Sequence, residues 1–381
     1  MKEFDLIVVS VEPFPYGYAA TNRMLSYLTG LAKKKNILYL CLAGSSSTKS
    51  SNKDKTGCYR GIHFRYITKP TTKKPQSVIC RASSLLWRYC WAFFLLIIFY
   101  NYKSILVYSS QKTLLKIIHT VSIIKARPLY RDITELVGYN YSKSPSDIEQ
   151  MKKDISHYDG LITISRGIYN YFDNIPDKRK FLLPVLVDIS RFKGHKDNMR
   201  YFFCCSGANL ERDGLLDSLN GFLQFNKANK GYTLKIATSL NLNDPYHIKC
   251  KKIIDSNSDV IHYLGELPPY KIPDIMEQAT ALMLTPHSNY QTMGFPTKLG
   301  EYLASGTPTI CSSTEDLLSV ISSETTYIVP PNSPDMIAQA LCSIVNNPTE
   351  ANRIGSNGKQ LMLDKYTINV YLKKLIVFLH I

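Results

Sequence analysis

Short apolar runs alternate with segments of helical periodicity along almost the whole chain. In the first half, the strand-like runs are residues 5–10, 37–43, 62–67, 105–108 and 160–165, with an amphipathic segment at 20–34. In the second half, strand-like runs at 201–206, 233–238, 260–264, 281–285 and 308–312 alternate with helical segments at 214–229, 246–256, 272–278, 297–305 and 335–346. This alternation predicts parallel sheets with helices on both faces.

The composition changes at residues 184–200, where a proline and the charged run GHKDNMR indicate a linker. A chain of 381 residues with 45% hydrophobic content can bury two ordinary cores. We therefore predict an α/β protein with two doubly wound, Rossmann-like domains, residues 1–190 and 191–365, that meet at a cleft. In such sheets ligands bind beyond the carboxyl ends of the strands, so the turns after the strands are the places to search for chemistry.

The net charge of +16 predicts a positive field that attracts phosphate-bearing ligands, an anionic membrane or nucleic acid. The basic residues occur in separate segments, and no nucleic-acid-binding signature accompanies them, so we expect no nucleic acid partner. Nine cysteines without a regular framework are typical of reduced thiols. The N-terminus runs directly into a strand-like segment and does not resemble a signal peptide, which predicts a cytoplasmic protein.

One apolar run, YCWAFFLLIIFY at residues 89–100, is too short to span a bilayer. We favour a buried core helix for it. The alternative is a segment that lies on the inner face of the membrane as a peripheral attachment. In that case Lys73, Lys74, Arg81 and Arg88 would meet anionic lipid phosphates.

Two turns of the first domain contain candidate residues. In VSVEPFPYGYAATNRML (9–25), Gly17 lets backbone N–H groups approach an anion at the start of a helix, although a plain connecting loop fits equally well. In YRDITELVGYN (130–140), Asp132 and Glu135 are positioned to bind or deprotonate an acceptor hydroxyl. Both carboxylates are also suited to capping the next helix, Asp132 more than Glu135.

The first turn of the second domain, SGANLERDGLLDSL (206–219), places Ser206, Gly207 and Arg212 between a strand and a helix. A cation beside helix N-terminal amides is suited to a diphosphate. The alternative is an ordinary solvated loop arginine.

The segment GFPTKLGEYLASGTPTI (294–310) is the most specific of the chain. If its helix begins near Thr297, Lys298 and Glu301 lie on adjoining faces. Glu301 would accept hydrogen bonds from a ribose diol and Lys298 would reach phosphate. The alternative is an ordinary surface ion pair. We predict no metal site, because the eight histidines do not stand at ligand spacing from Cys, Asp or Glu.

Together these segments resemble the group 1 glycosyltransferases, a retaining family with the GT-B fold. The resemblance rests on FPYGYAATNR, HYDGLITISRGI, LLPVLVDISRF, SGANLERDG, HYLGELPPYKIPDIMEQA and, above all, GFPTKLGEYLASGTPTI. It implies an acceptor-side domain at 1–190, a donor-binding domain at 191–365, and a C-terminal helix at 366–381 that returns to the first domain.

The resemblance also implies a nucleotide-diphosphate sugar donor in the cleft, no other cofactor, and a glycan or lipid-linked acceptor. Glu301 would hold the ribose, Arg212 and the Gly17 loop the diphosphate, and Thr297 with Lys298 the phosphate or sugar. Leu264, Gly265 and Leu267 match the stretch that flanks the base.

Two positions depart from the family pattern. Met293 stands where members commonly have the first of two glutamates, and Arg131 stands where many have a histidine. The resemblance implies a retaining glycosyltransferase, and we expect Arg212 and Lys298 to stabilise its leaving diphosphate without a metal. A role in surface polysaccharide synthesis is a hypothesis that fits the positive charge and the apolar run at 89–100. The alternatives are a sugar-nucleotide epimerase and a non-catalytic partner subunit or membrane-docked binder of the same fold.

Overall fold

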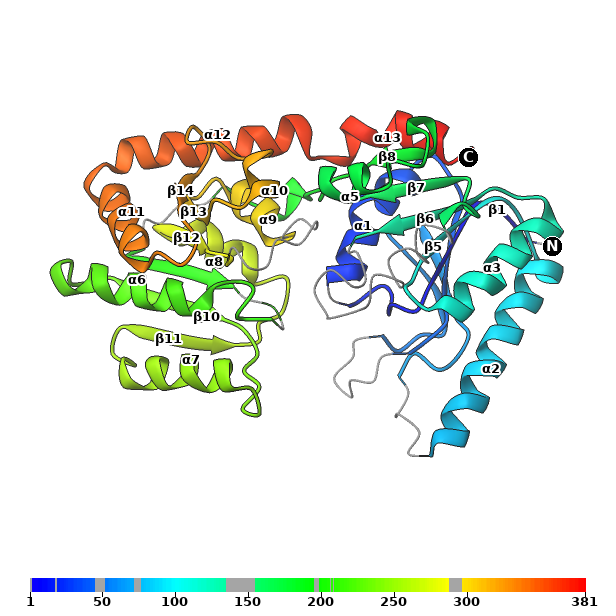
Figure 1. Cartoon of the computed structure of the whole chain (residues 1–381), viewed down its shortest axis with the longest axis horizontal. Coiled ribbons are helices and arrows are strands. Elements are labelled where there is room, and N and C mark those ends of the chain that lie inside the picture. The colour runs from blue at the N-terminus through cyan, green and yellow to red at the C-terminus, as the bar shows by residue number, and fades with distance from the viewer. Residues whose placement is uncertain are drawn as a thin grey trace. The chain divides into compact units, whose positions relative to one another are not determined.

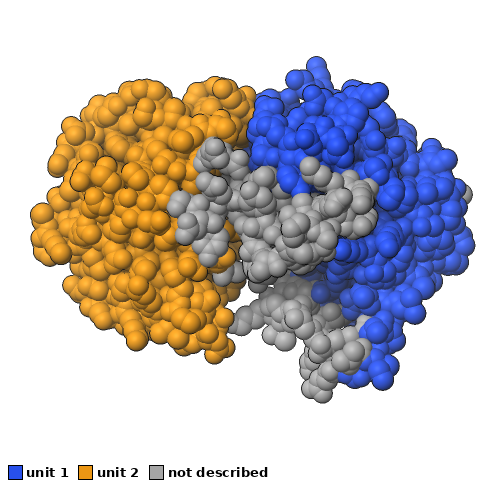
Figure 2. Space-filling model, in the orientation of Figure 1, with its two compact units in different colours: residues 1–186, 368–381 blue, residues 187–367 orange. Residues whose placement is uncertain are grey.

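The computed structural model describes residues 2–17, 19–44, 52–71, 77–134, 155–194, 199–205, 207, 209–287 and 297–381. The chain divides into two compact units, one formed by residues 1–186 with 368–381 and the other by 187–367. Figure 2 colours the two units separately. The first boundary falls four residues before the predicted 190/191, and the C-terminal helix belongs to the first unit.

The first unit is built around a sheet that is parallel except at one edge (Figure 1). Its strands are β1 (Lys2–Ser10), β2 (Ile37–Cys41), β3 (Thr56–Tyr59), β4 (Ile62–Tyr66), β5 (Tyr100–Tyr108), β6 (Leu129–Ile133), β7 (Gly160–Thr163) and β8 (Lys180–Leu182). The strand order is β3-β4-β2-β1-β5-β6-β7-β8, and only β3 runs antiparallel to its described neighbour. The order reverses between β1 and β5, which makes the carboxyl ends of these two strands the switch point of the sheet.

The helical segments of this unit are α1 (Ala19–Ala32), α2 (Val78–Phe94), η1 (Leu95–Phe99), α3 (Lys112–Lys125), α5 (Arg166–Tyr171), η2 (Asp177–Arg179) and α13 (Ile368–Phe378). The C-terminal helix α13 packs on α1, and a side chain at Gly30 would collide with Ile368, so a residue without a Cβ permits this packing. The core joins β1, β2 and β4 to α1 and α13. Phe14, which is fully buried in it, stacks on Tyr39 with ring centroids 4.4 Å apart.

The second unit contains a parallel sheet. Its strands are β9 (Tyr201–Cys205), β10 (Thr233–Ala237), β11 (Ile261–Gly265), β12 (Ala281–Leu284), β13 (Thr309–Ser312) and β14 (Tyr327–Val329), in the order β11-β10-β9-β12-β13-β14. The helical segments are η3 (Ile189–Arg191), α6 (Leu215–Ala228), α7 (Pro245–Ser256), α8 (Ile272–Gln278), α9 (Thr297–Ser305), α10 (Glu315–Leu318), α11 (Pro334–Asn346) and α12 (Pro348–Lys365). The order reverses between β9 and β12, as in a dinucleotide-binding domain. The predicted fold class of two doubly wound α/β domains is therefore confirmed.

The interpretation of residues 89–100 as a buried core helix is wrong. Residues 89–99 lie in α2 and η1, and Tyr100 begins β5; of the stretch Ala82–Phe99 only 22% of the residues are buried. The buried ones, Tyr89, Ala92, Leu95 and Leu96, form a stripe at helical spacing, and apolar side chains also cover much of the outer face.

Candidate functional site

The switch point of the second unit brings the loop after β9 to the start of α9. The Cys205 N–H at the end of β9 donates a hydrogen bond to the Tyr302 hydroxyl at 2.7 Å, which ties α9 to the strand. Tyr302 is fully buried, and burial raises its pKa well above the usual value, so the hydroxyl stays neutral. Burial also raises the pKa of the Cys205 thiol to about 11, against the opposing effect of the Lys298 ammonium. This thiol is therefore protonated at neutral pH and is a poor nucleophile.

Three groups predicted from the sequence converge on one carboxylate. The Lys298 ammonium lies 2.7 Å from Oδ2 of Asp213, and the Gly207 N–H donates to the same oxygen at 2.9 Å. Arg212 Nε lies 3.7 Å from the other oxygen. A Cβ at position 207 would sit 3.3 Å from the Lys298 ammonium, so glycine leaves this approach open. A backbone N–H, an ammonium and a guanidinium around one anionic group form an arrangement that also suits phosphate oxygens.

Asp213 is the residue of this cluster that sequence reasoning missed. Its position between Arg212 and Gly214 was visible in the sequence, and a carboxylate beside a proposed phosphate-binding cation is a signal. The signal is weak, however, because Lys298 is 85 residues away and only the fold brings the two together.

Gly214 fixes the loop that carries Asp213 and Arg212. It has φ +70°, in the left-handed region that favours glycine, and a Cβ there would collide with the carbonyl oxygen of Thr285, the residue after β12. The Thr285 hydroxyl donates to the Gly214 carbonyl at 2.9 Å. The chain therefore needs glycine at position 214 for conformation and for space.

We expect Gly214→Ala to destabilise the second unit by about 3–5 kcal/mol, from left-handed strain and from overpacking against a backbone oxygen. The check is urea unfolding followed by circular dichroism. Gly231→Ala is the matched control, because Gly231 has φ +88° but its Cβ would meet nothing nearer than an Arg200 nitrogen at 3.7 Å. Equal losses in the two variants would show that the collision is unimportant.

Glu301 lies one turn after Lys298 on α9 and is paired with Arg191. Arg191 Nη1 contacts Glu301 Oε1, and Nη2 donates to the Pro269 carbonyl at 3.0 Å. The side chain of Glu301 remains 31% exposed. Lys298 thus pairs with Asp213, and Glu301 pairs with Arg191. The alternative prediction, an ion pair between Lys298 and Glu301 on the surface, does not describe these contacts. The sequence analysis had not singled out Arg191, which is 110 residues from Glu301.

The stretch predicted to flank a base forms the end of β11 and the turn after it. Leu264, Gly265 and Leu267 are all partly exposed. Gly265 has φ +67°, and a Cβ there would meet nothing within 4 Å. Because Arg191 joins the Pro269 carbonyl to Glu301, the same arginine connects this turn to α9.

Ser206, Glu135 and Met293 lie outside the described residues, and for Thr297 only the backbone position at the start of α9 is described. In the first unit, Gly17 precedes α1 at the switch point between β1 and β5. A Cβ at Gly17 would collide with Thr21, whose hydroxyl donates to the Pro13 carbonyl at 2.7 Å. The Tyr66 hydroxyl bonds both backbone groups of Phe14 at 2.8 Å, so this loop is anchored to β4.

The structure does not support the expectation that Asp132 faces a substrate. Its side chain is fully buried and receives hydrogen bonds from Arg23 Nε and Nη2 at 3.1 Å each and from the Tyr27 hydroxyl at 3.0 Å. Arg23 also donates to the carbonyls of Leu183 and Pro184. Asp132 therefore joins α1, β6 and the segment after β8, and its oxygens are not accessible to an acceptor.

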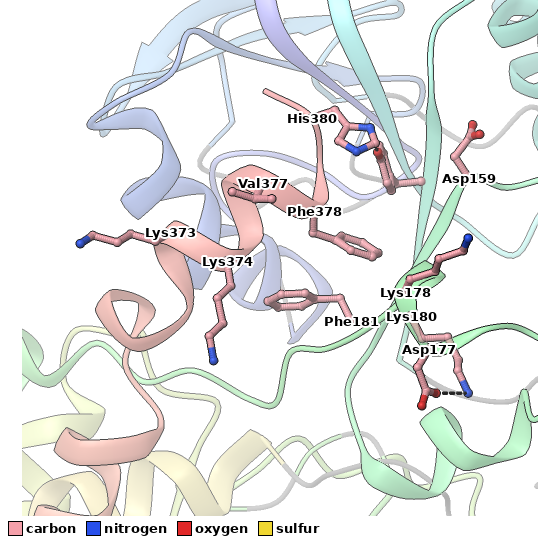
Figure 3. A pocket seen from close by; sticks show the side chains of 11 residues that line it. Asp159, Asp177, Lys178, Lys180, Phe181, Lys373, Lys374, Val377, Phe378 and His380 are labelled. Carbon is pink, nitrogen blue, oxygen red and sulfur yellow. Dashed lines mark hydrogen bonds and ion pairs between the residues drawn. The ribbon is translucent and has the colours of Figure 1, made fainter.

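A separate pocket of 550 Å³ lies within the first unit, between α13 and the edge strand β8 (Figure 3). Phe181, Phe378 and Val377 provide apolar lining, and Lys178, Lys180, Lys373 and Lys374 lie around it. None of the catalytic or donor-binding residues predicted from the sequence lines this pocket. Among the described residues, no group of three or more His, Cys, Asp or Glu side chains could hold a metal ion.

Comparisons with known proteins agree with this architecture. Residues 187–361 match the family model described as "Glycosyl transferases group 1". No curated protein sequence matches the chain.

Solved structures match over nearly the whole length. Sucrose-phosphate synthase from Thermosynechococcus elongatus is 15% identical with a TM-score of 0.74, covering 97% of this chain and 98% of that one. A glycosyltransferase from Rickettsia africae is 11% identical with a TM-score of 0.74, covering 98% and 97%. HepE from Anabaena, in complex with UDP and glucose, is 12% identical with a TM-score of 0.73, covering 99% of each chain. At these identities the likeness establishes the shared two-domain fold.

Proposed function

We propose that this chain, whose residues 187–361 match the family model of the group 1 glycosyltransferases, transfers a sugar from a nucleotide-diphosphate sugar to a glycan or lipid-linked acceptor. The observation that carries the proposal is the convergence of the Gly207 N–H, Lys298 and Arg212 on the Asp213 carboxylate. This cluster lies at the switch point of a doubly wound sheet, where such domains bind phosphate groups.

The contacts of the Asp213 carboxylate support a phosphate group as the ligand of this cluster. Carboxylate and phosphate oxygens accept the same charge-assisted hydrogen bonds. A donor diphosphate would take over the contact with Lys298 that Asp213 makes in the free protein. As the glycosidic bond to the donor breaks, negative charge grows on the leaving diphosphate, and Lys298 and Arg212 would stabilise it without a metal.

The rest of the donor would lie along α9 and the turn after β11. Glu301 would accept hydrogen bonds from the ribose diol while Arg191 fixes its carboxylate. Leu264, Gly265 and Leu267 would border the base. The structure of HepE holds UDP and glucose, which makes UDP the first nucleotide to test.

Further features of the reaction are proposals from the family resemblance. We propose retention of the anomeric configuration, a role in surface polysaccharide synthesis, and a cytoplasmic protein attached to the inner face of the membrane. Met293, in place of the first family glutamate, means that another group would contact the donor sugar.

The test is a thermal-shift screen against UDP, GDP, ADP and their sugar conjugates, with an assay for nucleotide release in the presence of acceptors. A donor at 100 times its Kd should stabilise the protein by about 2.7 kcal/mol. Glu301→Gln should lose this shift. The control Glu350→Gln changes an exposed carboxylate of the same unit, paired with Arg353, and should keep it.

Three other outcomes would redirect the assignment. If no nucleotide stabilises the protein, it is a non-catalytic partner subunit. If a nucleotide-sugar binds and a free epimerised sugar appears, it is an epimerase. If Glu350→Gln loses the shift as Glu301→Gln does, the placement of the ribose at Glu301 is wrong.

A further inference from the structure

An exposed apolar face covers α2 and η1 in the first unit. Ile79 is 80% exposed, Leu86 65% and Trp87 52%, and Ile98 in η1 is about half exposed. The rings of Trp87, Trp91 and Phe94 stack in sequence, with centroids 6.3 Å and 5.5 Å apart. Large exposed apolar surfaces of this kind mark sites that bind another apolar surface.

The face continues onto α3, which packs beside α2 and η1 (Figure 1). Ile123 and Ile124 near the end of α3 are both more than half exposed. The next residue, Lys125, donates from its ammonium to the Ile97 carbonyl of η1 at 3.2 Å, so the two apolar ends are neighbours. We call α2, η1 and α3 together the α2–α3 face.

The segment of the chain that contains this face carries charged side chains of one sign only. Residues 55–131 contain 14 lysines and arginines and no aspartate or glutamate, so this segment carries 14 of the chain's 16 net positive charges. The described helices contribute Arg88, Lys112, Lys116 and Lys125. An apolar partner protein does not require this charge, whereas an anionic lipid surface complements it.

Helix α2 and the following segment η1 pack against the rest of the first unit. By length and composition, the stretch Ala82–Phe99 could cross a membrane. However, the Tyr89 hydroxyl donates to Gln111 Oε1 at 2.8 Å, and Leu95 and Leu96 are buried against the unit. Spanning would break these contacts, whereas insertion of the outer face into one leaflet would keep them.

We propose that the α2–α3 face is a membrane-docking surface that inserts its apolar side chains into a leaflet rich in anionic phospholipid. Tryptophan and phenylalanine enter the interfacial region, and the lysines and arginines contact lipid phosphates. This surface brings the first unit to the bilayer, where a lipid-linked substrate would be found. The lipid binding itself does not depend on the proposed sugar transfer.

The chain carries its own probe for this proposal, because its two tryptophans, Trp87 and Trp91, both lie on α2. The experiment mixes the full-length protein with vesicles of phosphatidylcholine, with and without phosphatidylglycerol. The expected result is a blue shift of the tryptophan emission and co-sedimentation with the anionic vesicles only, both weakened by salt. Brominated lipids should quench the emission if the rings enter the leaflet.

Two double variants distinguish binding through this face from nonspecific hydrophobic adsorption to vesicles. Ile79→Gln with Leu86→Gln should weaken binding about 100-fold, since each large apolar side chain contributes about tenfold. The control, Leu242→Gln with Val377→Gln, removes two exposed apolar side chains elsewhere and should bind as the wild type does.

Three results would overturn the proposal: no blue shift with any vesicle, equal binding of the two double variants, or a lipid-free dimer in sedimentation that already shields the tryptophans. The last would assign the face to a second copy of the chain. The vesicle experiment contains no nucleotide. A negative result in it therefore does not affect the donor-binding test, and a negative donor-binding test does not affect the proposal of membrane docking.

Discussion

Replacing Lys298 by methionine should lower kcat for sugar transfer about 10²–10³-fold, the loss typical for removal of one group that stabilises charge in a transition state. The ammonium lies against the Asp213 carboxylate in the free protein and would face the donor diphosphate when that is bound. Because the charge on the leaving group grows as the bond breaks, kcat should fall more than the affinity for the donor. Steady-state kinetics with varied donor separates the two.

Removal of Lys298 also leaves Asp213, whose side chain is 7% exposed, without its nearest cation. The double variant Lys298→Met with Asp213→Asn removes the unpaired charge and should recover stability but not turnover. The control Lys251→Met makes the same change at an exposed pair with Asp255 on α7 and should leave stability and turnover nearly unchanged. If Lys298→Met retains turnover within about threefold, Lys298 has no part in transition-state stabilisation.

The sequence predicted the local elements and the fold class because these depend on periodicity. Continuous apolar runs such as 201–205 and 281–284 become parallel strands with all or nearly all residues buried, and the helix at 297–305 begins and ends as expected. Once the strands are assigned, the rule that ligands bind beyond their carboxyl ends selects Gly207, Arg212 and Lys298. The structure brings these three together.

The sequence could not supply the partners of these residues. The pairs Lys298–Asp213, Glu301–Arg191 and Asp132–Arg23 join positions 85 to 110 residues apart. No local pattern shows that Arg23, on the inner face of α1, reaches Asp132. An acidic residue at the end of a strand therefore looked available for catalysis when it is a buried structural group.

The misassigned run at 89–100 has a related cause. A helix that has apolar residues on both its buried face and its exposed face shows the same sequence pattern as a fully buried helix. Periodicity cannot distinguish the two, since Tyr89, Ala92 and Leu96 point inward while residues of the same character, such as Phe94 and Ile98, point outward. Only the fold shows which face is covered.

Arg23→Met should destabilise the first unit by about 3–5 kcal/mol, because it leaves Asp132 charged and buried without a cation. The same substitution deprives the carbonyls of Leu183 and Pro184 of their donor. Urea unfolding followed by tryptophan fluorescence measures the first unit selectively, since Trp87 and Trp91 both belong to it.

Adding Asp132→Asn to Arg23→Met should restore part of the lost unfolding free energy. The asparagine side chain is neutral and still accepts the hydrogen bond from the Tyr27 hydroxyl. Lys103→Met, at an exposed pair with Asp5 in the first unit, should cost at most about 1 kcal/mol. If Arg23→Met costs no more than this control, the buried pair is not what holds α1 to β6. If it does cost several times more while Asp132→Asn alone leaves sugar transfer intact in the folded protein, the role of Asp132 is to hold the first unit together, and the acceptor's base must be sought elsewhere.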